Sequence, residues 1–407
     1  MYTLCSEVRN IVFDIVSVKK YYTSAEFNEF LDIISKQFQV YVLGYCPEFK
    51  VYNNNVVIDS NFSFENHSDM IHFLEEINVE QYNTIIITAV TETVKVATKY
   101  NLSTVGLIMN YEDYKDYDIR YMPDQMWVVN NMKDILLNKG FGIAYFEQIG
   151  LNLVGPSKFV YSPIYTDQLT YAFNPEIKAD LIYTGRYFRF NDPRAYTHRL
   201  TQLLLHLKNN KIYAINALGN NMNRLLDNLK NNHANFDIIT VVPSRPNVSN
   251  RLESVLNFNL KEEYFLKIKL NLLYAKENYE TQKKKSTFEE KAHNVKDVFG
   301  YTETIEGHVL VIDDIFTSGA TALECARMLY EAGASKVTIL PFAVTQSSYA
   351  EKRFSLVKEE NETYKLFFRT VDSQPFWSAG YQGGTKDYSI GRNEYLKGNN
   401  VDNYFNR

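Results

Sequence analysis

The 407-residue chain is too long for one ordinary hydrophobic core, so we expect roughly two to three domains. Hydrophobic residues make up 45% of it and charged residues 22%, which excludes a mostly disordered or fibrous protein. Because the formal net charge is -5, the chain as a whole does not attract nucleic acid, and we expect no nucleic-acid partner.

The cysteines and the apolar runs indicate the compartment of the protein. Cys5, Cys46 and Cys325 are too few and too scattered for a disulfide framework or a zinc motif, so we expect reduced thiols in a cytoplasmic protein. No apolar run approaches the ~20 residues that cross a bilayer. We therefore expect a soluble protein without a membrane partner.

Residues 1–145 alternate short apolar runs with segments of helical periodicity. This alternation predicts a parallel sheet covered by helices, so we assign these residues to one α/β domain. The predicted strands are residues 10–14, 40–43, 84–88 and 103–108, and the predicted helices are residues 25–37 and 92–100.

A second α/β domain, also with a parallel sheet, is predicted at residues 180–345, with a variable part at 180–235 and a core at 236–345. Residues 146–179 lose periodicity and carry glycines and prolines, as in a linker or irregular insertion. The aromatic and glycine-rich extension 346–407 either caps the second domain or forms an interface, such as that of a homodimer. The predicted strands of the second domain are residues 236–242, 308–312 and 336–344, and the predicted helices are residues 193–207, 216–230, 251–275 and 321–332.

Residues 309–321 carry the strongest chemical signal. An apolar strand leads to Asp313 and Asp314, and α/β sheets bind ligands at the carboxyl ends of their strands. Neighbouring carboxylates on a strand point to opposite sides, so this pair suits a ligand with two hydroxyls better than a shared proton. The next residues combine hydroxyl groups with a glycine and enter a helix, whose N-terminus favours an anion. These residues are Thr317, Ser318, Gly319, Ala320 and Thr321. A diol site beside an anion site fits a sugar 5-phosphate.

The same stretch resembles the ribose-phosphate motif of type I phosphoribosyltransferases. The resemblance implies that family's fold, with phosphoribosyl pyrophosphate as donor substrate and Mg²⁺ as cofactor. It also implies that Asp313 and Asp314 act in catalysis and hold the ribose hydroxyls, directly or through water bound to Mg²⁺, while residues 317–321 bind the 5-phosphate. A buried strand that ends in two acids without binding anything is the alternative. Two other interpretations are disfavoured. A Walker B strand needs a GxxxxGK[ST] loop, which this chain does not contain. A receiver domain carries its acid pair near its first strand, whereas Asp313 and Asp314 lie late in the chain.

A second segment resembles the pyrophosphate loop of the same family. Pro243-Ser-Arg-Pro246 follows a predicted strand, and the resemblance implies that Ser244 and Arg245 bind pyrophosphate. A guanidinium matches phosphate oxygens in geometry and charge, so Arg245 would act in catalysis. An ordinary proline-bounded turn is the alternative.

Residues 282–299 resemble the ComF-type subgroup, although Lys291 stands where an arginine is more usual. The family closes a mobile loop over the pyrophosphate during the reaction. The resemblance implies that Lys283, Lys284 and Lys285 supply the charge of this loop, the last two acting in catalysis. A solvated lysine run is an equally open interpretation.

No motif specifies the acceptor of the phosphoribosyl group. In the family a variable hood before the core recognises it, and residues 180–235 occupy that position. The basic candidates in this range are Arg186, Arg189, Arg194 and His198. Nothing in them specifies a purine, a pyrimidine or another amine.

Residues 10–18 resemble the first motif of haloacid-dehalogenase-like (HAD-like) hydrolases, DxDx[TV], in which one acid attacks phosphate and the next is a general acid–base. Asp14 matches the first acid, but Val16 replaces the second, and Gly44 stands where a Ser or Thr binds phosphate. The resemblance implies a degenerate HAD-like Rossmannoid domain with phosphatase activity weak or absent. Asp14 then remains as a binding residue or a relic, and Glu92 is a remote candidate metal ligand.

Three functions are compatible with these features. The leading hypothesis is an enzyme of nucleotide metabolism, a glycosyltransferase that moves phosphoribose to or from a nucleobase-like acceptor with pyrophosphate release. The first alternative is a non-catalytic sensor of phosphoribosyl pyrophosphate or a nucleotide, with a role in protein interaction. The second is a bifunctional phosphoribosyltransferase–phosphatase. Arg245 and the lysine segment favour the enzyme, because a sensor needs no lid over pyrophosphate.

Overall fold

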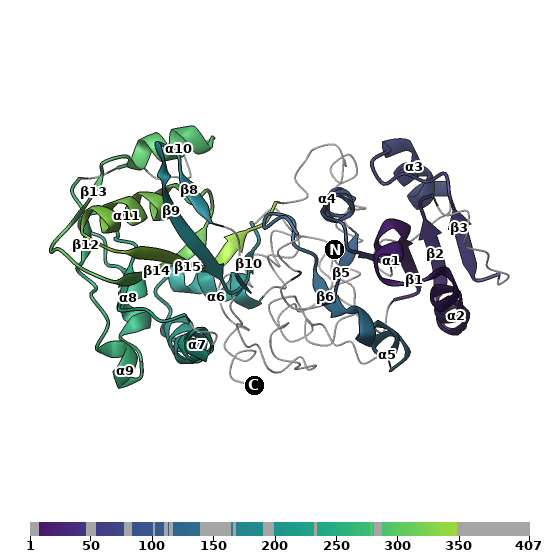
Figure 1. Ribbon diagram of the computed structural model, residues 1–407, viewed down its shortest axis with the longest axis horizontal. Helices are drawn as coiled ribbons and strands as arrows, with labels where there is room; N and C mark the ends of the chain where they lie inside the picture. Colours follow the sequence, from purple (N-terminus) through teal and green to yellow (C-terminus); the bar gives the residue numbers. More distant parts are fainter. Residues whose placement is uncertain are drawn as a thin grey trace. The chain divides into compact units, whose positions relative to one another are not determined.

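The computed structural model describes residues 8–45, 54–76, 84–100, 102–109, 113, 117–138, 164–165, 168–189, 199–231, 234–277, 279–280 and 287–347. The chain is an α/β protein with two compact units (Figure 1). Of the described residues, the first unit comprises those in 8–138, 188–189 and 346–347, and the second those in 164–187 and 199–345. No described helix is both long enough and apolar enough to span a membrane.

The first unit contains a six-stranded sheet in the order β3-β2-β1-β4-β5-β6, and every pair of neighbouring strands is parallel. The strands are β1 (Asn10–Asp14), β2 (Gln39–Leu43), β3 (Val56–Asp59), β4 (Thr84–Thr88), β5 (Ser103–Ile108) and β6 (Gln125–Val128). This is a doubly wound order, in which the strand order reverses between β1 and β4. Ligands of such sheets bind at that switch point.

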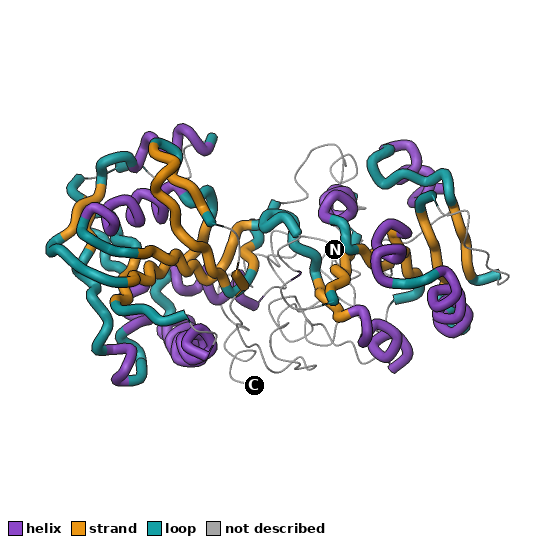
Figure 2. The backbone as a smooth tube through the Cα atoms, viewed as in Figure 1, coloured by secondary structure: helices purple, strands orange, loops and turns teal. Residues whose placement is uncertain are grey.

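Helices cover both faces of this sheet (Figure 2), and each face has its own apolar core. Successive residues of β1 enter opposite cores: Phe13 packs with Phe27 on one face, and Val12 clusters with Tyr41 and Phe73 on the other. The helical elements are α1 (Ile15–Tyr21), α2 (Ser24–Ile34), α3 (His67–Ile71), the π-helix η1 (His72–Glu76), α4 (Thr91–Lys99), the 3-10 helix η4 (Val129–Asn131) and α5 (Met132–Asn138).

The second unit contains a mixed sheet in the order β11-β14-β15-β9-β7. Its centre is parallel, whereas β7 and β8 pair antiparallel with β9, and β10 pairs with the end of β15. The strands are β7 (Ile164–Tyr165), β8 (Leu169–Tyr171), β9 (Asn174–Tyr183), β10 (Arg186–Tyr187), β11 (Ile238–Val241), β14 (His308–Phe316) and β15 (Lys336–Thr345); β12 (Leu273–Ala275) and β13 (Phe299–Tyr301) form a separate antiparallel ribbon. The helices are α6 (Arg199–Lys208), α7 (Ile212–Asn231), α8 (Arg251–Leu256), α9 (Glu262–Phe265), α10 (Phe288–Val295) and α11 (Ala320–Glu331).

Several predicted elements are confirmed, and three predictions are wrong. The sheet of the second unit, expected to be parallel, is mixed, because β7 and β8 pair antiparallel with β9. The strands at 10–14, 84–88 and 103–108 have the predicted bounds. Residues 164–165, 169–171 and 174–179, expected in a linker, instead form β7, β8 and the first part of β9, where β8 pairs with the exposed start of β9. The helix expected at 251–275 is divided into α8, α9 and β12, because Asn259 adopts a left-handed φ of 53° that an α-helix cannot continue through.

Candidate active site

The carboxyl ends of β11 and β14 lie side by side. The Val242 N–H donates to the Ile312 carbonyl oxygen at 2.9 Å, which continues the parallel pairing of the two strands. The loop that begins at Pro243 therefore leaves the sheet beside Asp313. This arrangement brings together the segments that the sequence analysis assigned to pyrophosphate and to ribose.

The two carboxylates lie within β14, which runs beyond the predicted strand end to Phe316. The Asp314 N–H donates to Asp313 Oδ1 at 2.8 Å, and the Ile315 N–H donates to Asp314 Oδ1 at 2.7 Å. Burial of the carboxyl group, together with repulsion from Asp314, raises the pKa of Asp313 to about 8, although the charge of Lys208 lowers it. The surroundings of Asp313 thus disfavour its negative charge, which a bound cation would stabilise. Carboxylate oxygens are the hard ligands that Mg²⁺ prefers.

The turn after β14 requires a glycine at position 319. Gly319 has a φ of +82° and caps the N-terminus of α11, and a Cβ there would lie 2.4 Å from the Phe316 ring. The Ala320 N–H donates to Ser318 Oγ at 3.4 Å, while Thr317 is exposed. The first turn of a helix has backbone N–H groups without carbonyl partners inside the helix, and such groups suit the anion that the sequence analysis expects at this turn.

Arg245 is exposed, and its guanidinium lies over the ring of Tyr279, 6.0 Å from the ring centroid. The ring packs edge-on against Phe299, which is fully buried, with 5.7 Å between the ring centroids. Burial is the main cause that raises the pKa of Tyr279 to about 12, and the charges of Arg245 and Asp313 act on it in opposite directions. Tyr279 therefore lies close enough to both Arg245 and Asp313 for their charges to act on it. Sequence reasoning missed it, because an aromatic residue shortly before a lysine run is no recognised signal.

The described part of the segment 282–299, residues 287–299, has a structural role. The Asn294 amide donates to the carbonyl oxygen of Glu280 at 2.9 Å, which holds the chain beside Tyr279, and Val295 and Phe299 are core residues. Lys291 lies on α10 and is partly exposed. The three lysines expected in the mobile loop lie outside the described residues: Lys283, Lys284 and Lys285.

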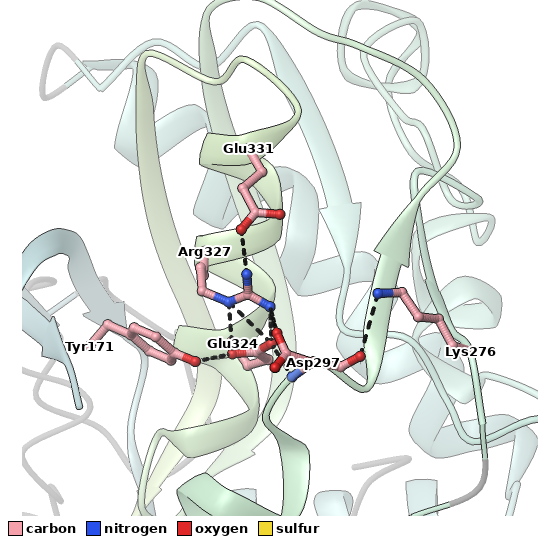
Figure 3. A network of polar contacts seen from close by, with 6 residues as sticks. All are labelled: Tyr171, Lys276, Asp297, Glu324, Arg327 and Glu331. Carbon is pink, nitrogen blue, oxygen red and sulfur yellow. Dashed lines mark hydrogen bonds and ion pairs between the residues drawn. The ribbon is translucent and has the colours of Figure 1, made fainter. Parts of the chain in front are cut away.

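A buried polar network fixes the helix that carries the turn (Figure 3). Glu324 is fully buried on α11, where its carboxylate accepts hydrogen bonds from Tyr171 of β8 and from Arg327. It also accepts the N–H of Asp297 at 2.8 Å, and the Asp297 carboxylate accepts from Arg327 at 2.9 Å. Figure 3 shows Glu331 at the other side of the guanidinium. The network joins α11 to β8 and to the turn before β13. It therefore fixes the position of the helix that follows the turn at residues 317–319.

Of the basic residues expected in the hood, Arg186 is fully buried in β10, Arg189 is exposed, and Arg194 and His198 lie outside the described residues. Lys208, which sequence reasoning missed, ends α6 with its Nζ 5.1 Å from the centroid of the Tyr187 ring. It is the hood residue whose charge acts on Asp313.

In the first unit, Asp14 ends β1 at the switch point of the sheet but is only 3% exposed. Its Oδ2 accepts hydrogen bonds from the hydroxyls of Thr88 at 2.8 Å, Thr93 at 2.7 Å and Ser17 at 3.3 Å, and its Oδ1 accepts the Val16 N–H at 3.0 Å. The carboxylate thus caps α1 and joins β1 to β4 and α4. A carboxylate surrounded in this way is a poor nucleophile.

The other HAD-like positions are also unsuited to phosphate chemistry. The Val16 side chain is 63% exposed, Gly44 has a φ of +110°, and a Cβ on Gly44 would lie 2.7 Å from Ile15 Cγ2. Glu92 points outward and pairs with Lys95 at 2.8 Å. Glu92 therefore takes part in an ion pair at the surface.

Within the part of the chain that the structure describes, no group of three or more His, Cys, Asp and Glu side chains is arranged to hold a metal ion. Cys325, on α11, is a buried free thiol. Compared with models of known protein families and with curated protein sequences, the chain matches none.

Proposed function

We propose that the second unit is a ComF-like type I phosphoribosyltransferase that binds phosphoribosyl pyrophosphate and Mg²⁺ and transfers phosphoribose to, or from, a nucleobase-like acceptor. The observation that supports this most is the adjacency of three groups at one edge of the sheet. Asp313 and Asp314 suit a diol, the turn 317–321 suits a phosphate, and Arg245 suits a pyrophosphate. A diol, a phosphate and a pyrophosphate are the polar parts of the proposed donor, phosphoribosyl pyrophosphate.

In the proposed reaction, the bond between ribose C1 and the pyrophosphate oxygen breaks, and its electron pair leaves on pyrophosphate. A lone pair of the acceptor nitrogen forms the new bond to C1. Asp313 and Asp314 hold the ribose hydroxyls, and the Arg245 guanidinium stabilises the charge that develops on the leaving group. Mg²⁺ held by the carboxylate pair would neutralise the pyrophosphate.

A sensor that binds the donor without turnover is the second candidate. The contact between Arg245 and Tyr279 favours the enzyme, because it orders a guanidinium on the loop that leaves the sheet next to the strand of Asp313, where it would stabilise the charge of a leaving group.

For the first unit we propose a HAD-like fold without phosphatase activity. The strand order with β1 next to β4 and the buried, fully engaged Asp14 support this proposal over a bifunctional enzyme. We also propose that the protein acts in the cytoplasm, in keeping with the free thiol of Cys325.

The test is to incubate the full chain with phosphoribosyl pyrophosphate, Mg²⁺ and a pooled metabolite extract, and to follow pyrophosphate by mass spectrometry. An enzyme releases pyrophosphate in step with the loss of one extract component. Tight binding of the donor without release in any pool would contradict transfer and favour the sensor.

A further inference from the structure

Arg251 is a second arginine beside the loop that the proposed function assigns to pyrophosphate. It is the first residue of α8, which follows this loop, residues 243–250, and its side chain is partly exposed. Within the described part of the chain, Arg251 forms no hydrogen bond, ion pair or ring contact. The fold therefore holds a guanidinium here without using it as a structural contact.

Asn250 closes the loop at its base. Its Nδ2 donates to the carbonyl oxygen of Val242 at 2.9 Å, and its Oδ1 accepts the Leu252 N–H at 3.1 Å. The Val242 N–H in turn donates to the carbonyl oxygen of Ile312 on β14. The start of α8 therefore returns to the carboxyl end of β11, next to the strand that carries Asp313.

The loop folds back between its two ends, so Arg245 and Arg251 come from its two limbs. The Val248 N–H donates to the carbonyl oxygen of Arg245 at 3.1 Å, and Asn247 has a left-handed φ of 64°. The Cα–Cβ bonds of a helix tilt toward its N-terminus, so the Arg251 side chain starts toward the loop rather than toward the far end of α8. Two cations thus flank one short, closed loop.

The position of Arg251 does not benefit the stability of α8. The first N–H groups of a helix lack carbonyl partners, and their partial positive charge favours an acid over a cation. The acid of the first turn, Glu253, is two residues further on and lies on another side of the helix. An unpaired cation at a position that the helix itself disfavours indicates a role in binding an anion.

We propose that Arg251 is a second binding residue for pyrophosphate and acts on it together with Arg245. This inference rests on the proposed function and adds a selectivity, because the loop then takes a diphosphate in preference to a single phosphate. Pyrophosphate carries more negative charge than one guanidinium balances, and each guanidinium can form two parallel hydrogen bonds to phosphate oxygens. The 5-phosphate binds separately, at residues 317–321, and does not depend on Arg251.

The test compares two probes on the full chain: Mg²⁺-pyrophosphate for the loop and ribose 5-phosphate for the turn 317–321. Calorimetry measures both dissociation constants. Arg251→Gln should weaken the binding of Mg²⁺-pyrophosphate at least about tenfold, as expected for the loss of a hydrogen bond between charged groups, and should change that of ribose 5-phosphate by less than about twofold. Arg251→Lys keeps the charge but not the paired donors, so its affinity for pyrophosphate should lie between those of wild type and Arg251→Gln.

Two further variants serve as controls. Arg224→Gln removes the same charge from an exposed position on α7 and should leave both dissociation constants unchanged. Asn250→Ser keeps an oxygen that can cap α8 but is too short to donate to Val242, so it should weaken only the binding of pyrophosphate. The melting temperature of Arg251→Gln should equal or exceed that of wild type, because the helix loses a cation at its N-terminus.

Three results would overturn the inference, and they identify which assignment is wrong. If wild type binds Mg²⁺-pyrophosphate and Arg251→Gln binds it equally well, Arg251 is not a binding residue, while the proposed function stands. If Arg251→Gln loses affinity for both probes to the same extent, Arg251 supports the fold rather than pyrophosphate binding. If wild type binds neither probe, the proposed function fails, and this inference fails with it.

Discussion

The guanidinium of Arg245 lies 6.0 Å from the centroid of the Tyr279 ring, and that ring is held edge-on by Phe299. The contact joins the loop after β11 to the segment that follows β12. An exposed arginine loses side-chain entropy when it binds an anion, and a ring that already holds it reduces that loss. Tyr279 is therefore a positioning residue for the proposed pyrophosphate site.

Replacing Tyr279 tests this contact. Tyr279→Leu should weaken the binding of Mg²⁺-pyrophosphate by a few-fold to about 30-fold, the range of a cation–π interaction, whereas Tyr279→Phe should bind like wild type. Calorimetry measures both. Tyr274→Leu, at an exposed tyrosine of β12, is the control and should have no effect. Equal affinities of the Leu variant and wild type would remove Tyr279 from the site.

Gly319→Ala should damage the proposed 5-phosphate site. The variant carries a Cβ at a φ of +82° and against the Phe316 ring, so we expect a loss of about 1–2 kcal/mol in unfolding free energy and at least tenfold weaker binding of ribose 5-phosphate. Gly307→Ala is a matched control, because Gly307 has a φ of +92° and a Cβ there would lie 2.4 Å from Asp237. It should lose similar stability in urea titrations but keep its affinity. Loss of affinity in both would trace the effect to the fold.

The raised pKa of Asp313 predicts how the metal-free protein responds to pH. The folded-state pKa is about 8 and the ordinary value is 3.8, so the folded protein binds a proton that the unfolded chain releases between these values. The stability that Asp313 contributes is complete below about pH 4 and is lost as the pH rises toward 8. In urea titrations with a chelator, Asp313→Asn should therefore gain stability relative to wild type as the pH rises from 5 to 8. Parallel curves would contradict the raised pKa of Asp313.

The buried Asp14 predicts an inactive first unit with a structural carboxylate. Thr93→Val removes the hydroxyl that donates to Asp14 at 2.7 Å and should cost about 1–3 kcal/mol of unfolding free energy. Thr98→Val, at another buried threonine of α4, should cost less. Neither wild type nor Asp14→Asn should hydrolyse p-nitrophenyl phosphate. Hydrolysis by wild type that disappears in Asp14→Asn would show an active phosphatase.

The parts of the fold that sequence reasoning predicted are those where burial dominates. β1, β4 and β5 are almost entirely buried, so each contains a run of at least three residues without a polar side chain. The sequence also predicts the strand-to-helix turn that carries Asp313, Asp314 and Gly319, because this turn is local in sequence.

The missed features depend on pairing between distant segments. The first half of β9 is exposed and contains Pro175, and only its partner β8 makes it a strand. Tyr279 and Lys208 are ordinary residues in the sequence. Tyr279 gains a role only through its contact with Arg245, and Lys208 only through the effect of its charge on Asp313. Contacts of this kind have no periodicity or spacing that a single sequence can reveal.

The most direct test of the proposed function is the binding of phosphoribosyl pyrophosphate in the presence of Mg²⁺, measured by calorimetry for wild type and for Asp313→Asn combined with Asp314→Asn. Both substitutions keep the size of the side chain but replace one acceptor oxygen with an NH₂ donor and remove the charge that would hold Mg²⁺ and the ribose hydroxyls. We predict saturable binding to wild type and at least a hundredfold loss of affinity in the double variant, with its melting temperature maintained. Undiminished affinity in the double variant, or no binding to wild type, would contradict the assignment of this site.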